Sequence, residues 1–187
     1  MQLTKPQQTI ANSKKRFRVV SAGRRFGKTF LAIRDLCYFA RIPHRNIYYV
    51  APTYRMAKTV VWDELKMRLQ NLRWVKKINE TDLTIRLVNG SKISLRGSDN
   101  PDALRGVSLD FVVFDEFADV DPTTWEYVIR PALADKQGHA LWIGTPKGKG
   151  NHFYDLYEWA GAQDEWETFK YTSADGGQIP EEEIELA

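Results

Sequence analysis

Residues 21–29 carry the strongest indication of the fold, and they read Ser21-Ala22-Gly23-Arg24-Arg25-Phe26-Gly27-Lys28-Thr29. They follow residues 16–22, whose apolar and β-branched side chains predict a strand. They open residues 28–41, where apolar residues recur at helical spacing. A strand, a turn containing two glycines and a helix that begins at Gly-Lys-Thr form the setting that a phosphate-binding loop requires. These residues therefore predict a P-loop at the start of an α/β domain.

Each residue type in this loop has a chemical reason to be there. Gly27 lets the backbone approach a phosphate closely, Lys28 neutralises β- and γ-phosphate charge, and Thr29 offers its hydroxyl to Mg²⁺. Ala22 stands where the strict pattern has its first glycine, but backbone N–H groups and a positive helix N-terminus matter more than that glycine. The expected nucleotide-binding residues of the loop are Ala22, Gly23, Arg24, Arg25, Phe26, Gly27, Lys28 and Thr29.

Two acidic residues supply the carboxylates that a P-loop site needs, one to hold Mg²⁺ and one to activate water. Residues 110–115 form a near-continuous apolar run, as expected of a strand buried on both faces, and the run ends in Asp115 and Glu116. Asp115 at the strand end can hold Mg²⁺ opposite Thr29. Glu116 is then free to act on the attacking water as a general base, a role worth roughly 10²–10⁴-fold in rate. We expect Asp115 and Thr29 to form the metal site and Glu116 to be catalytic.

Two further positions carry weaker signals. Trp142-Ile143-Gly144-Thr145-Pro146 predicts a strand that ends in a small hydroxyl residue, which can place Thr145 near the γ-phosphate. An ordinary strand end followed by a turn is the alternative. Gln8 precedes the first strand, and its amide carries both a donor and an acceptor that match the edge of adenine. A solvated polar residue is the alternative there.

The rest of the chain alternates between predicted strands and helices. Strands are expected at 46–51, 140–144 and 166–172, and helices at 55–72, 122–130 and 151–160. In the helix expected at 55–72, the residues expected to face inward are Val60, Val61, Leu65 and Leu69. Residues 83–88 and 91–96 flank Asn89-Gly90, a pair that favours a type I′ hairpin turn. This order predicts a three-layer α/β domain with a mainly parallel central sheet and an antiparallel hairpin insertion.

The amino-acid composition excludes several other classes of protein. With 187 residues, 43% of them hydrophobic, the chain can bury the core of one domain, so disorder is excluded as its main state. One cysteine excludes a disulfide framework. Neither a secretory signal nor a run of about 18 apolar residues occurs, so we expect a soluble intracellular protein with no membrane partner.

The net charge of +3 conceals an asymmetry along the chain. Residues 1–58 contain 13 Lys and Arg and a single acid, Asp35, whereas residues 59–187 contain 14 bases and 23 acids. The first part is suited to polyanions, either nucleotide phosphates or nucleic acid. A solvated basic face is the alternative interpretation.

Taken in order, these motifs resemble the ATPase domain of large terminase subunits, the motors that package DNA into the heads of tailed phages and herpesviruses. The resemblance extends from Pro6 to about Ile184. Its most specific segments are Gly23-Arg24-Arg25-Phe26-Gly27-Lys28-Thr29, Val50-Ala51-Pro52-Thr53, Leu104-Arg105-Gly106, Phe114-Asp115-Glu116-Phe117 and Gly144-Thr145-Pro146.

The resemblance implies further roles for particular residues. Arg24 matches the loop arginine that acts in cis on the phosphates, and Arg105 matches an arginine finger that acts in trans on a neighbouring subunit. Gly144, Thr145 and Pro146 match the coupling motif that links hydrolysis to movement. Pro6 and Gln8 match the adenine-recognition motif. The implied fold is RecA-like and of the ASCE type (additional strand, catalytic glutamate), with the Thr145 strand between the Lys28 and Asp115 strands.

The implied activity is hydrolysis of ATP with Mg²⁺, coupled to translocation of double-stranded DNA into a viral procapsid. The implied partners are double-stranded DNA, the small terminase subunit, the portal protein and further copies of the chain in a ring. The implied location is the host cytoplasm, with transient docking on the procapsid. Large terminases also carry a C-terminal nuclease domain, so we expect residues 1–173 to form the ATPase domain and 174–187 to begin a linker. We expect no nuclease activity from this chain.

Two alternatives remain at the level of sequence. A helicase-like or remodelling P-loop ATPase is one, since Val50-Ala51-Pro52-Thr53 also resembles a helicase motif, but a helicase core needs a second RecA-like domain. The other is a nucleotide-controlled binding module with negligible hydrolysis. Such a module would lack the catalytic acid, and Glu116 is present.

Overall fold

An eight-stranded sheet forms the centre of the protein, in the strand order β3-β4-β5-β2-β6-β7-β1-β8. The computed structural model describes residues 2–176. The strands are β1 Phe17–Ala22, β2 Asn46–Ala51, β3 Val75–Asn79, β4 Thr84–Leu87, β5 Lys92–Gly97, β6 Phe111–Asp115, β7 His139–Gly144 and β8 Trp166–Tyr171. The helices are α1 Lys5–Asn12, α2 Lys28–Ala40, α3 Tyr54–Ala57, α4 Asp63–Asn71, α5 Arg130–Ala134 and α6 His152–Ala160.

The strand directions place the expected site residues at one edge. Strands β5, β2, β6, β7, β1 and β8 run parallel to one another, and β7 lies between β1 and β6, as expected for the ASCE order. Parallel strands end at the same edge of a sheet. The loops after β1, β6 and β7 therefore meet, although about 90 residues separate the first loop from the second.

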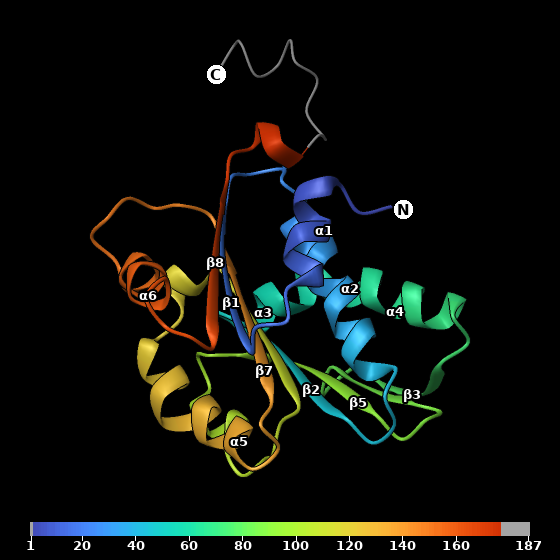
Figure 1. Ribbon diagram of the computed structural model, residues 1–187. Coiled ribbons are helices and arrows are strands. Elements are labelled where there is room, and N and C mark those ends of the chain that lie inside the picture. The colour runs from blue at the N-terminus through green and yellow to red at the C-terminus, as the bar shows by residue number, and fades with distance from the viewer. Residues whose placement is uncertain (1, 177–187) are drawn as a thin grey trace.

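Helices cover both faces of the sheet, so the core has two halves. Figure 1 shows α1, α2 and α4 on one face and α5 and α6 on the other. The half of the core between the sheet and α5 and α6 is rich in aromatic side chains. In it, the rings of Trp125 and Trp142 meet edge to face, with centroids 4.7 Å apart. Because the central strands are buried on both faces, their sequences are continuous apolar runs, which is why they could be predicted.

The expected hairpin forms, but its turn differs from the prediction. Strands β4 and β5 pair antiparallel, and β5 also pairs parallel with β2. Gly90 has a φ of 85°, while Asn89 stays out of the left-handed region, so the turn is not type I′. The Asn89 side chain instead donates to the Ala40 carbonyl oxygen at the end of α2 (2.8 Å) and accepts from the Ser91 N–H (3.0 Å). These contacts favour a longer turn with Gly90 alone at positive φ.

The helix expected at 55–72 is continuous but contains a π-helical turn at Lys58–Trp62, between α3 and α4. A π turn holds one more residue than an α turn and so shifts the helical phase. Val61, Leu65 and Leu69 are buried as expected, whereas Val60 is 43% exposed. The expectation that Val60 faces inward is therefore wrong. A second π-helical turn, Thr124–Ile129, leads into α5 where one helix was expected.

Two further expectations concern the linker at the C-terminal end of the sequence and the possibility of membrane-spanning helices. The linker expected at 174–187 falls mostly outside the described residues, which include only the turn Ala174–Gly176 of it. Within residues 2–176, no helix combines the length and the apolar character needed to cross a membrane.

Candidate nucleotide-binding site

The loop between β1 and α2 curls because two of its residues adopt left-handed backbone conformations. Arg25 has a φ of 62° and Gly27 a φ of 88°. Gly27 is also the N-cap of α2, and its lack of a side chain leaves the first N–H groups of the helix without a side-chain cap. These groups and the helix dipole make the start of α2 suited to an anion.

Contacts beneath the loop hold it in place. Phe26 is fully buried, and its ring stacks on Tyr171 of β8 with centroids 5.2 Å apart. The buried Gln7 of α1 donates from Nε2 to the Phe26 carbonyl oxygen (2.9 Å) and accepts from the Thr4 N–H at Oε1 (3.0 Å). A Cβ at Gly23 would lie 2.3 Å from Ser173 Oγ, so this position needs glycine for close approach. The loop is thus braced by α1 and by the segment after β8.

Lys28, the first residue of α2, turns its side chain back over the loop. Its Nζ donates to the carbonyl oxygens of Ala22 and Gly23, at 2.8 Å each. Burial lowers the pKa of Lys28 and nearby Arg24 adds to this, while the carboxylates of Glu116 and Asp115 oppose it. Both carboxylates therefore lie close enough to the Lys28 ammonium to stabilise its charge.

Asp115 ends β6 with its carboxylate almost fully buried. The Tyr49 hydroxyl of β2 donates to Oδ2, and the Glu116 N–H donates to Oδ1 at 2.8 Å. Burial raises the pKa of Asp115 above its ordinary value and the neighbouring Glu116 adds to this, although both hydrogen bonds act in the opposite direction. The pKa of Tyr49 lies well above its usual range because of burial and the adjacent Asp115. Each Asp115 oxygen keeps a lone pair for one more partner.

Glu116 leaves the strand in a strained conformation and turns toward β7. Its φ of 47° is left-handed, which is rare for a residue other than glycine. The Thr145 hydroxyl, just past the end of β7, donates to Glu116 Oε1 at 3.3 Å. Lys147 forms a second link, an ion pair with Asp119, so the loops after β6 and β7 are joined twice.

These loops surround an open cleft of about 1090 Å³. It brings together seven of the predicted site residues: Arg24, Arg25, Gly27, Lys28, Thr29, Glu116 and Thr145. Eight predicted residues do not line it: Gln8, Ala22, Gly23, Phe26, Arg105, Asp115, Gly144 and Pro146. Phe26 acts instead as the buried anchor of the loop. Gln8 is exposed outside the cleft, where its Nε2 donates to the carbonyl oxygen of Leu3, just before α1 (2.9 Å).

Arg105 lies away from the cleft, after the turn Pro101–Leu104. Its side chain is 62% exposed, and its Nε is 3.5 Å from the exposed carboxylate of Asp102. An ion pair between two exposed side chains contributes little to stability, about 0–1 kcal/mol. The arginine is therefore free to reach another molecule.

Sequence reasoning missed several residues around the cleft. Gln2 and Thr4 line it from the N-terminal segment, and Val60, Glu64 and Arg68 line it from the helix after β2. Arg68 donates from Nε to Glu64 (3.0 Å) and lies over the Phe30 ring, 4.6 Å from its centroid. The i, i+4 spacing of Glu64 and Arg68 was visible in the sequence, but nothing local connected that pair with the P-loop.

The fold and the site together define a class of protein. A P-loop after β1, a carboxylate pair after β6 and the strand β7 between them are the features of an ASCE-type P-loop NTPase domain. Comparison with known proteins narrows this class. Residues 19–185 match the family described as terminase large subunit, T4likevirus-type, N-terminal, and the chain belongs to this family.

Curated relatives agree with this assignment. The large terminase subunit of Escherichia phage T5 is 32% identical over 159 residues, an alignment that covers 81% of this chain and 36% of the relative. That of Thermus phage G20c is 30% identical over 171 residues, which cover 81% of this chain and 35% of the relative. The chain thus spans about a third of the length of these relatives.

Solved structures share the fold. The large terminase ATPase domain of Thermus phage P74-26 superposes with a TM-score of 0.82 at 26% identity, covering 98% of this chain and 91% of that one. The large terminase of another thermophilic bacteriophage, solved in complex with ADP, has a TM-score of 0.84 at 17% identity, covering 98% of this chain and 49% of that one. At this lower identity the likeness concerns the fold alone.

Proposed function

We propose that this chain binds ATP in the cleft at the ends of β1, β6 and β7, hydrolyses it, and serves as the motor domain of a terminase that drives double-stranded DNA into a viral procapsid. One observation carries the proposal. Glu116 and the loop residues Lys28 and Thr29 line the same cleft from strands two places apart. Membership of the terminase family and the likeness to a domain described as an ATPase support it.

In this proposal Thr29 and Asp115 hold Mg²⁺. Both Asp115 oxygens already accept one hydrogen bond and keep a lone pair each, which suits contact through an ordered water. The raised pKa of Asp115 marks a carboxylate whose charge is poorly solvated, so a nearby cation stabilises its ionised form. When bound, Mg²⁺ neutralises charge on the phosphate oxygens.

Lys28 exchanges its two carbonyl acceptors, on Ala22 and Gly23, for phosphate oxygens when the triphosphate binds. Glu116 takes the proton of the attacking water. The Thr145 hydroxyl reaches the carboxylate that performs this step, so a change at Glu116 is transmitted to the loop after β7. Gly144, Thr145 and Pro146 thereby couple hydrolysis to movement.

Two arginines have different placements and so different proposed roles. Arg24 lines the cleft and acts on the phosphates of its own subunit. Arg105 is exposed outside it and acts on the nucleotide of a neighbouring copy in a ring. A guanidinium can neutralise charge that develops on the γ-phosphoryl group in either case. The adenine is recognised by the N-terminal segment, where Gln2 and Thr4 line the cleft and Gln8 lies on α1.

Further proposals follow from the family and not from the site itself. They are a complex with the small terminase subunit and the portal protein, and a host-cytoplasmic location with transient docking on the procapsid. We assign no nuclease activity to this chain.

Steady-state ATP hydrolysis, measured with and without duplex DNA at several protein concentrations, tests the proposal. We expect Mg²⁺-dependent turnover that rises with protein concentration, because the trans arginine acts only where subunits meet. Turnover that persists unchanged in Lys28→Ala would come from another site and would overturn the assignment of this cleft.

A further inference from the structure

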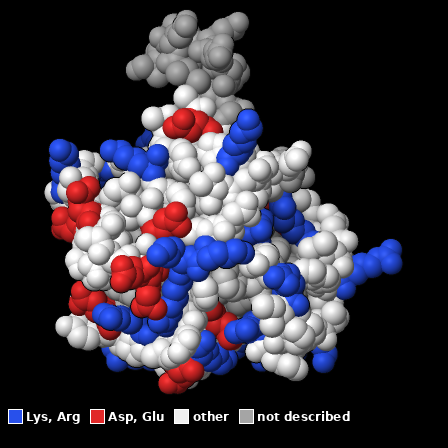
Figure 2. All heavy atoms as spheres, in the orientation of Figure 1, with Lys and Arg blue, Asp and Glu red and all other residues white. Residues whose placement is uncertain are grey.

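A second cleft lies at the opposite edge of the sheet, where β1, β6 and β7 begin. It has a volume of about 410 Å³ and shares no lining residue with the nucleotide cleft. Its walls come from the end of α1, the second half of α2 and the loops that precede β1, β2 and β7. On the face seen in Figure 2, basic side chains run across the middle and lower part, while acidic side chains gather on the side of α6.

The cleft is lined by far more positive than negative charge. Seven lysines and arginines line it against two aspartates, a surplus of five. The seven are Lys14, Lys15, Arg18, Arg34, Arg41, Arg45 and Lys136. Six of them belong to the basic N-terminal part of the sequence. The nucleotide cleft uses only Arg24, Arg25 and Lys28 from that part, so phosphate binding there does not account for the asymmetry.

The two aspartates are already neutralised by cations from different elements. The fully buried Asp35 lies 2.7 Å from both Arg18 and Arg34. Asp110, whose side chain is 4% exposed, is paired with Arg45 and Lys136. These pairs fix the guanidinium groups of Arg18 and Arg45 at the cleft wall. Arg18 is almost fully buried and also donates to the Ile10 carbonyl oxygen, whereas the more exposed Arg45 keeps N–H groups for another acceptor.

The middle of the cleft has a different character. His139 at the start of β7 lies beside the Phe39 ring, with ring centroids 5.4 Å apart. Burial, followed by the nearby charges of Arg18, Arg16 and Arg45, lowers the pKa of His139. The imidazole offers neutral N and C–H groups between the cationic ends.

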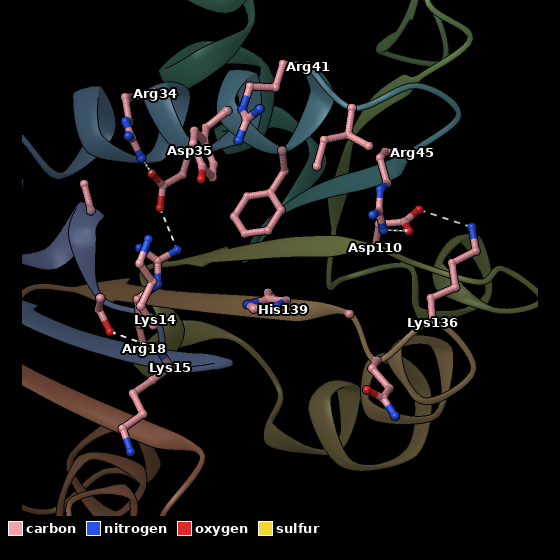
Figure 3. A pocket seen from close by; sticks show the side chains of 17 residues that line it. Lys14, Lys15, Arg18, Arg34, Asp35, Arg41, Arg45, Asp110, Lys136 and His139 are labelled. Atoms are coloured by element: carbon pink, nitrogen blue, oxygen red, sulfur yellow. Dashed lines mark hydrogen bonds and ion pairs between the residues drawn. The ribbon is translucent and has the colours of Figure 1, made fainter.

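The charges are arranged in a row and not around one point. Figure 3 shows Lys14, Lys15 and Arg18 at one end of the cleft and Arg45 and Lys136 at the other, with His139 between them and Arg41 on the rim. A single small anion would contact one end only. A chain of regularly spaced anions contacts both, and the planar fork of arginine matches phosphate oxygens.

We propose that this cleft binds the phosphodiester backbone of nucleic acid, through charge and without reading base sequence. The proposal deepens the proposed motor function, because it names the side chains that hold the DNA. It does not depend on ATP hydrolysis, since the two clefts have no residue in common.

The double variant Lys14→Glu with Arg41→Glu tests it. Both side chains are exposed, and neither is paired with Asp35 or Asp110 in the described structure. The matched control is Arg130→Glu with Lys170→Glu, which makes the same change of charge at exposed positions on α5 and β8. Binding of a fluorescent mixed-sequence duplex is measured by anisotropy over a range of salt concentrations, without nucleotide.

We expect the Lys14/Arg41 variant to bind the duplex at least about tenfold more weakly, with the slope of log K against log salt reduced by about two. The control should keep most of the affinity and the slope. Equal losses in both variants would mean that only net charge matters, and an unchanged slope in the first would exclude phosphate contacts at this cleft. Either result overturns the proposal.

Two further measurements separate the outcomes. If polyglutamate of equal charge displaces the duplex as well as unlabelled DNA does, the cleft is a site for an acidic protein segment and the proposal is wrong. ATP turnover without DNA is measured in the same variants, where we expect it unchanged. If the protein binds DNA at this cleft but does not hydrolyse ATP, the proposed motor function is wrong, while the proposal that this cleft binds DNA still stands.

Discussion

At the scale of single residues, the site contains one strained backbone conformation and two charged groups that are partly removed from water. Glu116 has a left-handed backbone, Asp115 a buried carboxylate and Lys28 a partly desolvated ammonium. A left-handed conformation in a residue other than glycine costs roughly 1–3 kcal/mol. Strain and desolvation of this kind concentrate at functional sites, because the surrounding structure must hold reactive groups in place before the ligand arrives.

Lys28→Ala should abolish productive triphosphate binding and leave the fold intact. The side chain bonds only to loop carbonyl oxygens in the described structure and faces the cleft, so its removal exposes no core. Titration with a fluorescent ATP analogue, alongside a thermal melt, measures both effects. Lys5→Ala on the exposed surface of α1 is the control. Loss of binding accompanied by unfolding would leave the lysine without a ligand role.

Glu116→Gln should separate binding from hydrolysis. The amide keeps the size of the side chain and an oxygen acceptor for Thr145, but it cannot take a proton from water. We expect ATP binding near that of the unchanged protein and turnover lower by roughly 10²–10⁴. Single-turnover hydrolysis measures this directly. Near-normal turnover would move the catalytic role to another acid, and Asp119, paired with Lys147, is the nearest candidate.

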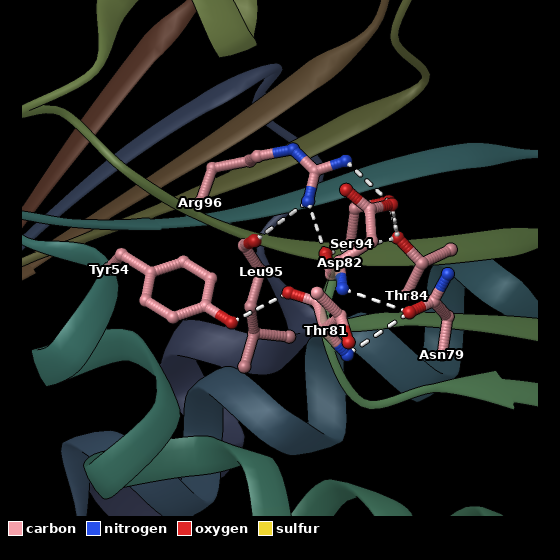
Figure 4. A network of polar contacts seen from close by, with 8 residues as sticks. All are labelled: Tyr54, Asn79, Thr81, Asp82, Thr84, Ser94, Leu95 and Arg96. Atoms are coloured by element: carbon pink, nitrogen blue, oxygen red, sulfur yellow. Dashed lines mark hydrogen bonds and ion pairs between the residues drawn. The ribbon is translucent and has the colours of Figure 1, made fainter.

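At the scale of elements, polar networks hold strands that hydrophobic burial alone does not. Strand β3 has mostly exposed side chains and was not predicted from the sequence. Figure 4 shows how the turn after it is held: Asn79 Oδ1 accepts from the N–H groups of Thr81 and Asp82, and Arg96 donates to the Asp82 carbonyl oxygen at 2.7 Å. The Tyr54 hydroxyl donates to the Thr81 carbonyl oxygen. The antiparallel edge is thereby fastened to β5 and α3.

A second network joins the starts of β2 and β6. Asp110 accepts from the Asn46 N–H (2.8 Å) and pairs with Arg45 and Lys136. Burial alone would raise the pKa of Asp110, but these hydrogen bonds outweigh it, and the pKa lies below its ordinary value. A carboxyl with a depressed pKa in the folded state contributes stability above its unfolded pKa and loses it as pH falls through the folded value.

Asp110→Asn should therefore destabilise the domain by about 1–3 kcal/mol at neutral pH, since it leaves two cations without their carboxylate. The difference from the unchanged protein should shrink as pH falls below about 4. Urea denaturation at several pH values measures this, with the exposed Asp135→Asn as the control. A difference that is constant from about pH 3 to about pH 7 would contradict the ionised pair.

At the scale of the whole molecule, the parallel sheet separates two binding edges. The ends of β1, β6 and β7 form the nucleotide cleft, and the beginnings of the same strands form the basic cleft. Arg105 lines neither cleft and is exposed, so the trans role proposed for it requires a second copy of the chain.

Arg105→Ala should remove the rise of specific activity with protein concentration and leave nucleotide binding by one subunit nearly intact. A finger supplied in trans can raise turnover by roughly 10³–10⁵, and it works only where subunits dock. The measurement is ATP hydrolysis against protein concentration, together with nucleotide affinity.

Mixing distinguishes this role from a local ion pair with Asp102. Arg105→Ala subunits combined with Glu116→Gln subunits should recover some activity at mixed interfaces. If demonstrably co-assembled subunits recover none, the trans role is wrong and Arg24 becomes the main candidate for the catalytic arginine.

Features that depend on neighbouring residues could be predicted from the amino-acid sequence alone. Gly27-Lys28-Thr29 at a strand-to-helix junction predicted the phosphate loop, and an apolar run ending in Asp115 and Glu116 predicted the second half of the site. Both are local patterns, in which periodicity and turn chemistry act over a few residues. The pairing of β4 with β5 was likewise predictable from Asn89-Gly90, although the type of turn was not.

Contacts between side chains far apart in the chain were set by the packed fold and could not be predicted. Packing made Phe26 an anchor on Tyr171, shifted Val60 out of the core through a π turn, and gave the buried contact with the loop to Gln7 while Gln8 stays exposed. It also gathered cations from residues 14–136 into one cleft. Such contacts depend on loop closure and on packing between elements, and no short stretch of sequence encodes them.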